Sequence, residues 1–364
     1  MKEELPYWND KPHKGFLIIQ NHDLQAGFGA LMLYALNGIR KAQERNLIPV
    51  IDFNADNCPY FYDKNTGENI WDYYFESVSP YSHDQVQFWL KEGQIQPDQV
   101  QYVNSKESAE THQYDPDRLA TFWAWKAPND PAQWMAEKRA LGRKFVKVYI
   151  KPRASILEKT EKLVASTFKA DFIIGVHIRG TDFAYAQPTP VSTYFEAIDQ
   201  LILQKELTYF QIYVATDQQQ FLEAFVQRYQ GKVISQGATR STNHIAPFRL
   251  DQVSGYLKGE EVLLDVLALS KCQHVLKGAA AVGELALWFT KLEDITDFAL
   301  QSAFNTKEYG DLESTYAQLN IGHKTRASLS LHKTRERLVR RSIESRLGKA
   351  LYTRFRWVRK LLKH

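Results

Sequence analysis

Short apolar runs alternate with helical segments between residues 170 and 300, and this alternation constrains the fold more than any other feature of the chain. Each run is long enough for one strand and precedes a loop or a helical pattern: FIIGVHI, FQIYVATD, KVIS and HVLKG. Repeated βα units of this length predict a parallel sheet with helices on both faces. DFAL (297–300) predicts one last strand, and Asp217 with Gln220 predicts a capping box that opens a helix.

A second unit of the same kind opens the chain. GFLIIQ (15–20) and LIPVIDF (47–53) are apolar runs, separated by the turn NHDLQAGFG and a segment with apolar residues at helical spacing. This βαβ pattern predicts a parallel sheet with a functional loop at the carboxyl end of its first strand. The aromatic-rich stretch that follows predicts helices around 84–92 and 131–166.

Together these patterns predict an α/β protein with two Rossmann-like domains that face each other across a cleft. We expect an N-terminal α/β domain over 1–165, a second α/β domain over 166–305, and a linker with a basic C-terminal helix over 306–364. Open α/β sheets bind ligands at the carboxyl ends of their strands, so the loops at those ends are the candidate site.

The composition is that of a globular protein, because charged residues make up 24% and aromatic residues 13% of the chain. The only two cysteines, Cys58 and Cys272, cannot form a disulfide framework and lack metal-ligand spacing. The N-terminus has no apolar signal segment, and no apolar stretch reaches the length of a membrane span. We therefore expect a cytoplasmic protein whose body is soluble.

The C-terminal segment 331–364 differs from the rest in charge. It holds twelve Lys and Arg against Glu336 and Glu344, so it carries +10 while the remainder carries −6. Apolar residues recur along it at helical spacing, which predicts a basic amphipathic helix. Such a helix can bind an anionic membrane, here the inner face of the cell membrane, or it can pack its apolar face on the body. Nucleic-acid binding is disfavoured, because no groove-reading motif accompanies the charge.

The stretch GVHIRGTDF (175–183) places polar residues where a buried strand ends. Alternate strand residues share a face, so His177 and Arg179 lie on one side, while Gly180 lets the backbone leave the sheet and Asp182 follows in the loop. The planar fork of an arginine suits the oxygens of a diphosphate. A structural Arg–Asp pair that closes the loop is an equally good interpretation.

A second strand ends in the turn LKGAAAVGE, which supplies another candidate site. Small residues let a phosphate approach the backbone, and the free N–H groups of a helix start attract anions. The same residues can instead allow close packing of helix on sheet. The candidates in this turn are Lys277, Gly278, Ala280, Ala281 and Glu284.

The loop QAGFGAL brings Gly27 and Gly29 to the start of the first helix. Met32 stands where a dinucleotide fingerprint has its third glycine, so a nicotinamide enzyme is a poor fit. The glycines predict a tight turn that a ligand can approach. His22 and Asp23 in this loop either face the cleft or are solvated.

No metal site, cofactor motif or nucleophile motif is present: HExxH, G-x-S-x-G and a Walker loop are all missing. Asp265 lies within VLLDVLAL, an apolar helical segment where a carboxylate is unexpected. It is either paired within the protein or reaches a ligand.

Three segments resemble, in order, the three motifs of the O-fucosyltransferase/α1,6-fucosyltransferase superfamily: GVHIRGTDF, IYVATDQQQFLEAFVQRYQGKVIS and EEVLLDVLALSKCQHVLKGAAAVGELAL. The match covers about 170–290, and QAGFGALMLYAL is similar to the glycine loop and helix that open the family's first domain. The resemblance implies a GT-B-like fold, GDP-fucose as the donor, inversion of the anomeric carbon and no metal.

By position, Arg179 matches the arginine that holds the donor β-phosphate, and His177 matches the histidine that lines the donor site. Asp265 matches the acidic residue that contacts guanosine, and GAAAVGE stands in place of the phosphate-binding turn. The acceptor, a glycan or lipid-linked polysaccharide, would lose its hydroxyl proton to a carboxylate or histidine. The candidates for this base are, in order, Asp182, Asp23 and His22.

The chain departs from the family pattern at three places. Gly180 stands where the α1,6 branch has a second arginine, alanines at 279–281 replace an expected serine, and Gln187 stands where some members carry a carboxylate. These departures leave two alternatives open. One is a transferase for a different sugar nucleotide, and the other is a catalytically silent relative that binds a glycan or scaffolds a membrane complex.

Overall fold

The computed structural model describes residues 13–24, 26–105, 118–122, 128–181, 189–243, 245–292 and 294–302. Contacts divide the chain into two units, Met1–Ile321 and Gly322–His364, and all of the described residues belong to the first. Asp182 and the basic segment 331–364 lie outside the described residues, so the predictions for them stay predictions.

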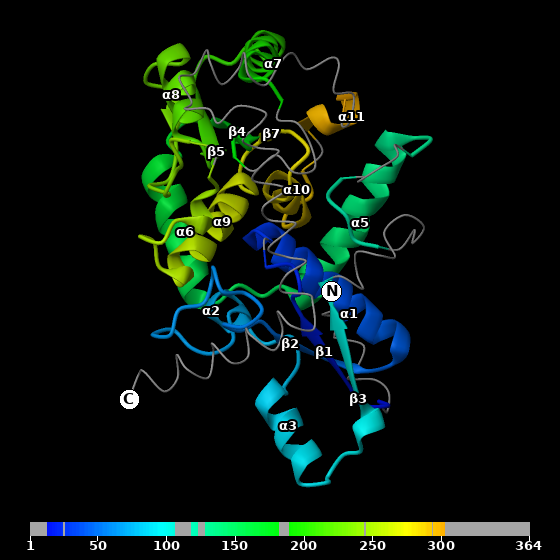
Figure 1. The fold of residues 1–364 in the computed structure, drawn as a ribbon. Coiled ribbons are helices and arrows are strands. Elements are labelled where there is room, and N and C mark those ends of the chain that lie inside the picture. The colour runs from blue at the N-terminus through cyan, green and yellow to red at the C-terminus, as the bar shows by residue number, and fades with distance from the viewer. Residues whose placement is uncertain are drawn as a thin grey trace, which may run out of the picture. The chain divides into compact units, whose positions relative to one another are not determined.

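The first sheet has three parallel strands in the order β2-β1-β3 (Figure 1). Its strands are β1 (Phe16–Gln20), β2 (Ile48–Asp52) and β3 (Val100–Asn104), and helix α1 (Phe28–Arg45) connects the first two. The sequence predicted this βαβ unit. A Cβ atom on Gly38 would lie 2.6 Å from the side chain of Ile19, so the absence of a side chain lets α1 pack directly on the sheet.

Five helices and turns follow β2 along the chain: α2 (Trp71–Tyr74), α3 (His83–Lys91), the 3₁₀ turn η2 (Pro97–Gln99), α5 (Pro131–Tyr149) and α6 (Ala154–Thr167). The helix expected at 84–92 is α3. The stretch 131–166 holds two helices, which separate at Pro152, a residue that pairs with Phe75 in an isolated bridge. Proline disfavours the helical conformation in the residue before it, which explains the break. The domain boundary predicted near 165 falls in the last turn of α6.

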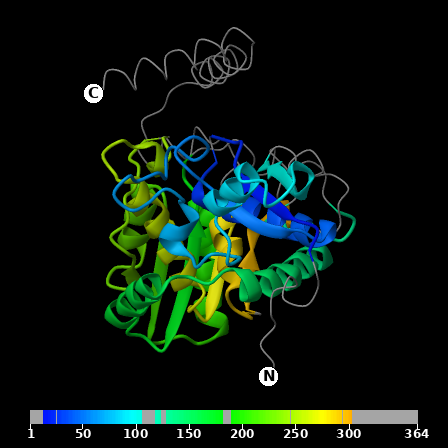
Figure 2. The same cartoon turned by 90° about the horizontal axis from the view of Figure 1, so that it is seen from below.

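The second sheet has five parallel strands in the order β6-β5-β4-β7-β8. Figure 2 shows them side by side, from green to orange. The strands are β4 (Phe172–Ile178), β5 (Phe210–Thr216), β6 (Val233–Ile234), β7 (His274–Lys277) and β8 (Ile295–Asp297). The chain builds outward from β4 in one direction and then in the other, so β4 and β7 flank the topological switch point. Ligands bind at such points in open α/β sheets.

The helices and turns of this second half are α7 (Val191–Gln204), α8 (Gln219–Arg228), η3 (Pro247–Arg249), α9 (Gly255–Leu269), α10 (Ala281–Trp288) and α11 (Phe298–Ser302). The prediction of a strand at 297–300 is wrong, because β8 ends at Asp297 and α11 begins at Phe298. The strand ends at Asp297, whose carboxylate accepts a hydrogen bond of 3.0 Å from the backbone N–H of Ala299 and so favours a helix start.

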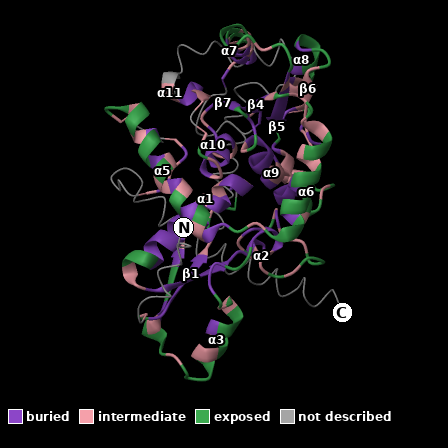
Figure 3. Ribbon diagram, turned by 180° about the vertical axis from the view of Figure 1, so that it is seen from behind, coloured by how far each residue is buried: buried purple, intermediate pink, exposed green. Residues whose placement is uncertain are grey.

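The two sheets share a hydrophobic core within the first unit. Figure 3 shows β1, β4, β5 and β7 mostly in the buried colour, while the outer faces of α3, α5 and α6 are exposed. Close contacts join the halves: a Cβ on Gly142 in α5 would lie 2.3 Å from Trp288 in α10, and one on Gly259 in α9 would lie 2.4 Å from Tyr74. None of the described helices combines the length and the hydropathy of a membrane span.

Candidate functional site

Arg179 follows the last residue of β4, and the loop around it is held by a buried carboxylate from the next strand. Asp217 accepts hydrogen bonds from the backbone N–H groups of Gly180 (2.6 Å) and Thr181 (3.3 Å), and from the hydroxyl of Thr181. Arg179 donates from Nε to the carbonyl of Thr181 at 3.0 Å. Burial raises the pKa of Asp217, and the nearby charge of Arg179 opposes that rise. The carboxylate thus fixes the turn that carries the arginine.

Asp217 was expected to cap a helix, and that prediction is wrong. Helix α8 begins at Gln219, and its N-cap, Gln218, makes no side-chain cap. The Asp217 carboxylate turns instead towards the end of β4. Sequence reasoning missed this role of Asp217, although its place at the end of a strand beside β4 was a usable signal.

Packing leaves no room for a side chain at Gly180. A Cβ atom there would lie 2.2 Å from Cβ of Gln218, a contact that no real structure accommodates. This loop therefore has no room for the second arginine that the α1,6 branch carries at this position. Arg179 is therefore the one arginine that the motif GVHIRGTDF could offer to a diphosphate.

His177 lies in β4 beside β7 and is 7% exposed. Burial, together with the charges of Arg179 and Lys277, lowers the pKa of its imidazole to about 3. The ring is therefore neutral at physiological pH. A Cβ on Gly283 would lie 3.0 Å from Nδ1 of His177, so the ring packs against the first turn of α10. Within the described residues, Nδ1 has no hydrogen-bond partner.

Two helices begin side by side at this point. Helix α10 starts after Ala280 and helix α1 after Gly27, and neither N-cap residue makes a side-chain cap. A Cβ on Gly29 would lie 3.0 Å from Cβ of Ala281, so the two first turns touch. Their N–H groups create a region of positive potential without a cationic side chain. Gly278 is also tightly placed, with Thr189 Oγ1 at 3.0 Å from its potential Cβ.

The loop after β1 is held by Ser105, the residue that follows β3. Its hydroxyl accepts from the backbone N–H groups of His22 (2.8 Å) and Asp23 (3.0 Å) and donates to Asn21 (3.1 Å). Tyr34 donates to Asp23 at 3.4 Å. His22 is exposed and Asp23 is half-buried. The sequence named His22 and Asp23, but it offered no signal for Ser105, since its strand was not predicted.

Lys277 and Glu284 do not face outward as binding groups. Both side chains are fully buried, with Lys277 Nζ 2.8 Å from Glu284 and 3.0 Å from Asp297. Arg139 reaches in from α5 and donates to both oxygens of Glu284 at 2.8 and 2.9 Å, and it also binds Asp297. The quartet Arg139, Lys277, Glu284 and Asp297 is thus a neutral ion network that anchors α10 to α5, β7 and β8.

Asp265 is also bonded within the protein. It is 9% exposed, and it accepts a hydrogen bond of 2.7 Å from the hydroxyl of Tyr213 and another from Gln236. Burial raises the pKa of Asp265 to about 6, and the two hydrogen bonds oppose this rise. Gln236 in turn donates to the carbonyl of Glu261 at 2.6 Å. Asp265 therefore supports the loop after β6, so in this structure its carboxylate is paired within the protein.

No family model matches the chain, and no curated protein matches it. Among solved structures, it is similar to the NodZ α1,6-fucosyltransferase crystallised with GDP, at 16% identity over 77% of this chain and 93% of that one, with a TM-score of 0.44. It is also similar to a variant of Arabidopsis thaliana FUT1 with GDP (11%, 79% and 72%, TM-score 0.45) and to POFUT1 with GDP (9%, 79% and 99%, TM-score 0.39).

Replacing Arg139 by Met should lower the free energy of unfolding by about 3 kcal/mol or more, because it leaves a buried carboxylate with too few cations. Adding Glu284→Gln to the same chain should recover part of that loss. Urea unfolding of the two single variants and the double variant measures the coupling.

The matched control is Lys162→Met, which breaks an exposed Lys–Glu pair on α6 whose side chains are 73% and 64% exposed. It should leave stability nearly unchanged. If Arg139→Met costs no more than this control, the network does not anchor α10.

Proposed function

We propose that this protein is a glycosyltransferase that moves fucose from GDP-fucose to a glycan or lipid-linked polysaccharide. The observation that carries the proposal is the meeting, at the switch point of the second sheet, of Arg179, neutral His177 and the start of α10. An arginine and backbone N–H groups at one point suit a nucleoside diphosphate. The choice of GDP-fucose rests on the three sequence motifs.

The proposed reaction needs positive charge at the leaving group. As the bond to the anomeric carbon breaks, negative charge grows on the diphosphate, and Arg179 with the N–H groups of α10 and α1 stabilises it. An acceptor hydroxyl attacks the opposite face of that carbon, which inverts it. Among the described residues, Asp23 and then His22 on the β1–α1 loop are the candidates to take the proton, and Asp182 is the candidate outside the described residues.

His177 suits an uncharged role in this scheme. Because its ring is neutral, it offers one N–H donor and one acceptor and adds no charge beside Arg179. In this scheme the loop after β6 contacts the guanine base. Asp265 holds that loop in place through its hydrogen bond with Gln236. In this scheme Lys277 and Glu284 support α10 and do not contact the donor.

Replacing Arg179 by Ala or Lys should lower turnover of GDP-fucose by a factor on the order of 10² to 10³, because the bidentate phosphate contact is lost. Release of GDP, with and without an acceptor extract, measures it. Arg228→Ala, which removes an arginine at the far end of α8 paired with Asp199, is the control and should be fully active. Near-normal activity of Arg179→Ala, or calorimetry in which UDP binds as tightly as GDP, contradicts the proposal.

Activity should persist in EDTA, because Arg179 and the helix N–H groups take the place of a divalent cation. In the described part of the chain, no group of three or more His, Cys, Asp or Glu side chains is arranged to hold a metal ion. The measurement is the initial rate of GDP release before and after chelation. Complete loss in EDTA with recovery in Mn²⁺ would assign the protein to a different class of transferase.

We further propose that segment 331–364 holds the enzyme on the inner face of an anionic membrane, where a lipid-linked acceptor resides. Twelve basic residues and a helical apolar pattern support this, at about 1 kcal/mol for each Lys or Arg near the surface. Deleting the residues after 330 should abolish sedimentation with phosphatidylserine vesicles and leave the melting temperature of the body unchanged. Pure phosphatidylcholine vesicles are the control.

If the full-length protein does not sediment with anionic vesicles at physiological salt, the membrane proposal fails. A large fall in melting temperature on deletion would instead support packing of the helix on the body.

A further inference from the structure

One face of the first sheet carries a half-exposed tyrosine ring on its edge strand β3. Residues Phe16, Ile18 and Gln20 of β1 share this face, and their register partners include Tyr102 and Asp52. Helix α3 and the turn before it cover the amino-terminal half, where the Phe16 ring lies 5.4 Å from Tyr81 and 5.9 Å from Trp89.

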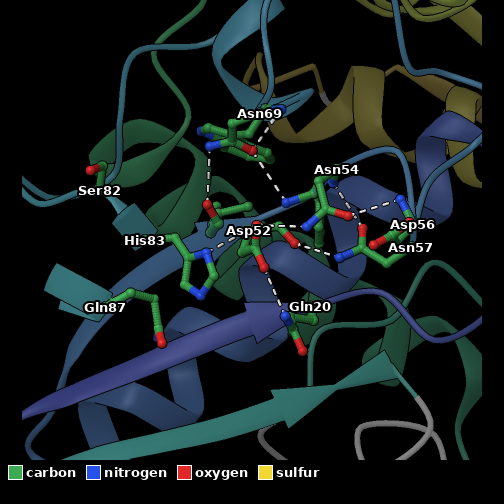
Figure 4. Close-up of polar contacts among 12 residues, drawn as sticks. Gln20, Asp52, Asn54, Asp56, Asn57, Asn69, Ser82, His83 and Gln87 are labelled. Atoms are coloured by element: carbon green, nitrogen blue, oxygen red, sulfur yellow. Dashed lines mark hydrogen bonds and ion pairs between the residues drawn. The ribbon is translucent and has the colours of Figure 1, made fainter. Parts of the chain in front are cut away.

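At the carboxyl half of the same face, Tyr102 is 48% exposed. Strands of parallel sheets are normally buried on both faces, so a half-exposed aromatic ring here is unusual. Gln87 of α3 lies beside it, and one turn earlier in the helix His83 approaches Asp52, which Gln20 also contacts (Figure 4). Gln87 donates to the Tyr102 hydroxyl at 2.8 Å.

The Asp52 carboxylate is the centre of this group. It accepts from Gln20 Nε2 at 2.7 Å and from Asn54 Nδ2 at 2.9 Å, and His83 Nδ1 lies 3.6 Å from it. Asp52 is 6% exposed, and no lysine or arginine of the described residues binds it. A carboxylate has about four acceptor positions, so hydrogen-bonding capacity remains.

The loop after β2 holds this carboxylate rigidly. Asn57 donates to the Asp52 carbonyl at 2.8 Å, and Asn69 donates to the Ile51 carbonyl at 3.0 Å. The two asparagines thus fix the carbonyl groups before and after the Asp52 Cα atom. A polar group fixed before the ligand arrives loses little entropy on binding.

The open edge of the group is formed by His83, Gln87 and Tyr102. The His83 side chain is 28% exposed, and its imidazole approaches the Asp52 carboxylate. Figure 4 shows His83 and Gln87 extending from α3 towards β1, with Gln20 at the end of that strand. The group therefore combines a nearly buried carboxylate, two amides, a partly exposed imidazole and a half-exposed tyrosine ring.

We propose that Gln20, Asp52, His83, Gln87 and Tyr102 form a subsite for one pyranose unit of a glycan. Amide and carboxylate oxygens accept from sugar hydroxyls, amide and imidazole N–H groups donate to them, and the tyrosine ring packs on the apolar face of the sugar. The charge of Asp52 excludes a phosphate ligand, and a lone carboxylate does not suit a divalent cation. The inference rests on the proposed function, because the sugar belongs to the acceptor.

The test is saturation-transfer NMR on the full chain with GDP present, using methyl β-galactoside, methyl α-mannoside and N,N′-diacetylchitobiose up to about 10 mM, where a millimolar complex is well populated. At least one sugar should bind the wild type. Asp52→Asn and Tyr102→Ala should each weaken that binding by about tenfold or more, since each removes a charged or stacking contact. Their affinity for GDP should match that of the wild type.

Tyr209→Ala is the matched control, because that tyrosine is similarly exposed, at 52%, in the second half of the chain. It should bind sugar as the wild type does. If the melting curve shows that Asp52→Asn does not fold, Gln87→Ala takes its place beside Tyr102→Ala. Both of these substitutions change partly exposed side chains, and sugar binding is measured for each variant.

Two results overturn the subsite. One is that none of the three sugars binds, and the other is that the variants bind as well as the wild type. The proposed donor site is judged separately by the Arg179→Ala variant, which should lose GDP and keep the sugar. A wild type that binds sugar but not GDP would count against the transferase proposal alone.

Discussion

A buried ion network is the constraint on which the candidate site depends. A buried carboxylate is tolerated only when cations and donors bind it, and Glu284 has Arg139 and Lys277. Glu284 lies in the first turn of α10, one residue after the glycine that contacts His177. The network therefore sets where α10 begins, and with it the position of the N–H groups beside β4.

Close backbone contacts extend this arrangement from one half of the unit to the other. Gly142 lets α5 lie directly on Trp288 of α10, and Gly29 lets the first turn of α1 touch Ala281. A larger side chain at either place would separate the helices. The loops after β1 and β4 are fixed in a similar way by single side chains, Ser105 and Asp217. These two loops of the candidate site are thus each held by a residue that follows a neighbouring strand.

The two polar regions of the molecule differ in charge, and this difference gives them different proposed ligands. The end of β4 combines Arg179 with helix N–H groups and suits an anion. The face around Asp52 combines a carboxylate with neutral amides and an exposed ring, and suits hydroxyl groups. A transferase needs both kinds of surface, one for a charged donor and one for an uncharged acceptor.

The sequence by itself determined the βα units and the residues at the ends of β1, β4 and β7, because apolar periodicity and glycine-rich turns are local signals. It placed His177 and Arg179 correctly at a strand end. Only the tertiary structure decided that Lys277, Glu284 and Asp265 are bonded within the protein, and that Asp217 and Ser105 hold the loops. Those pairings join residues far apart in the chain, and whether a buried charge meets an opposite charge or a ligand depends on strand order and helix packing, which no local pattern encodes.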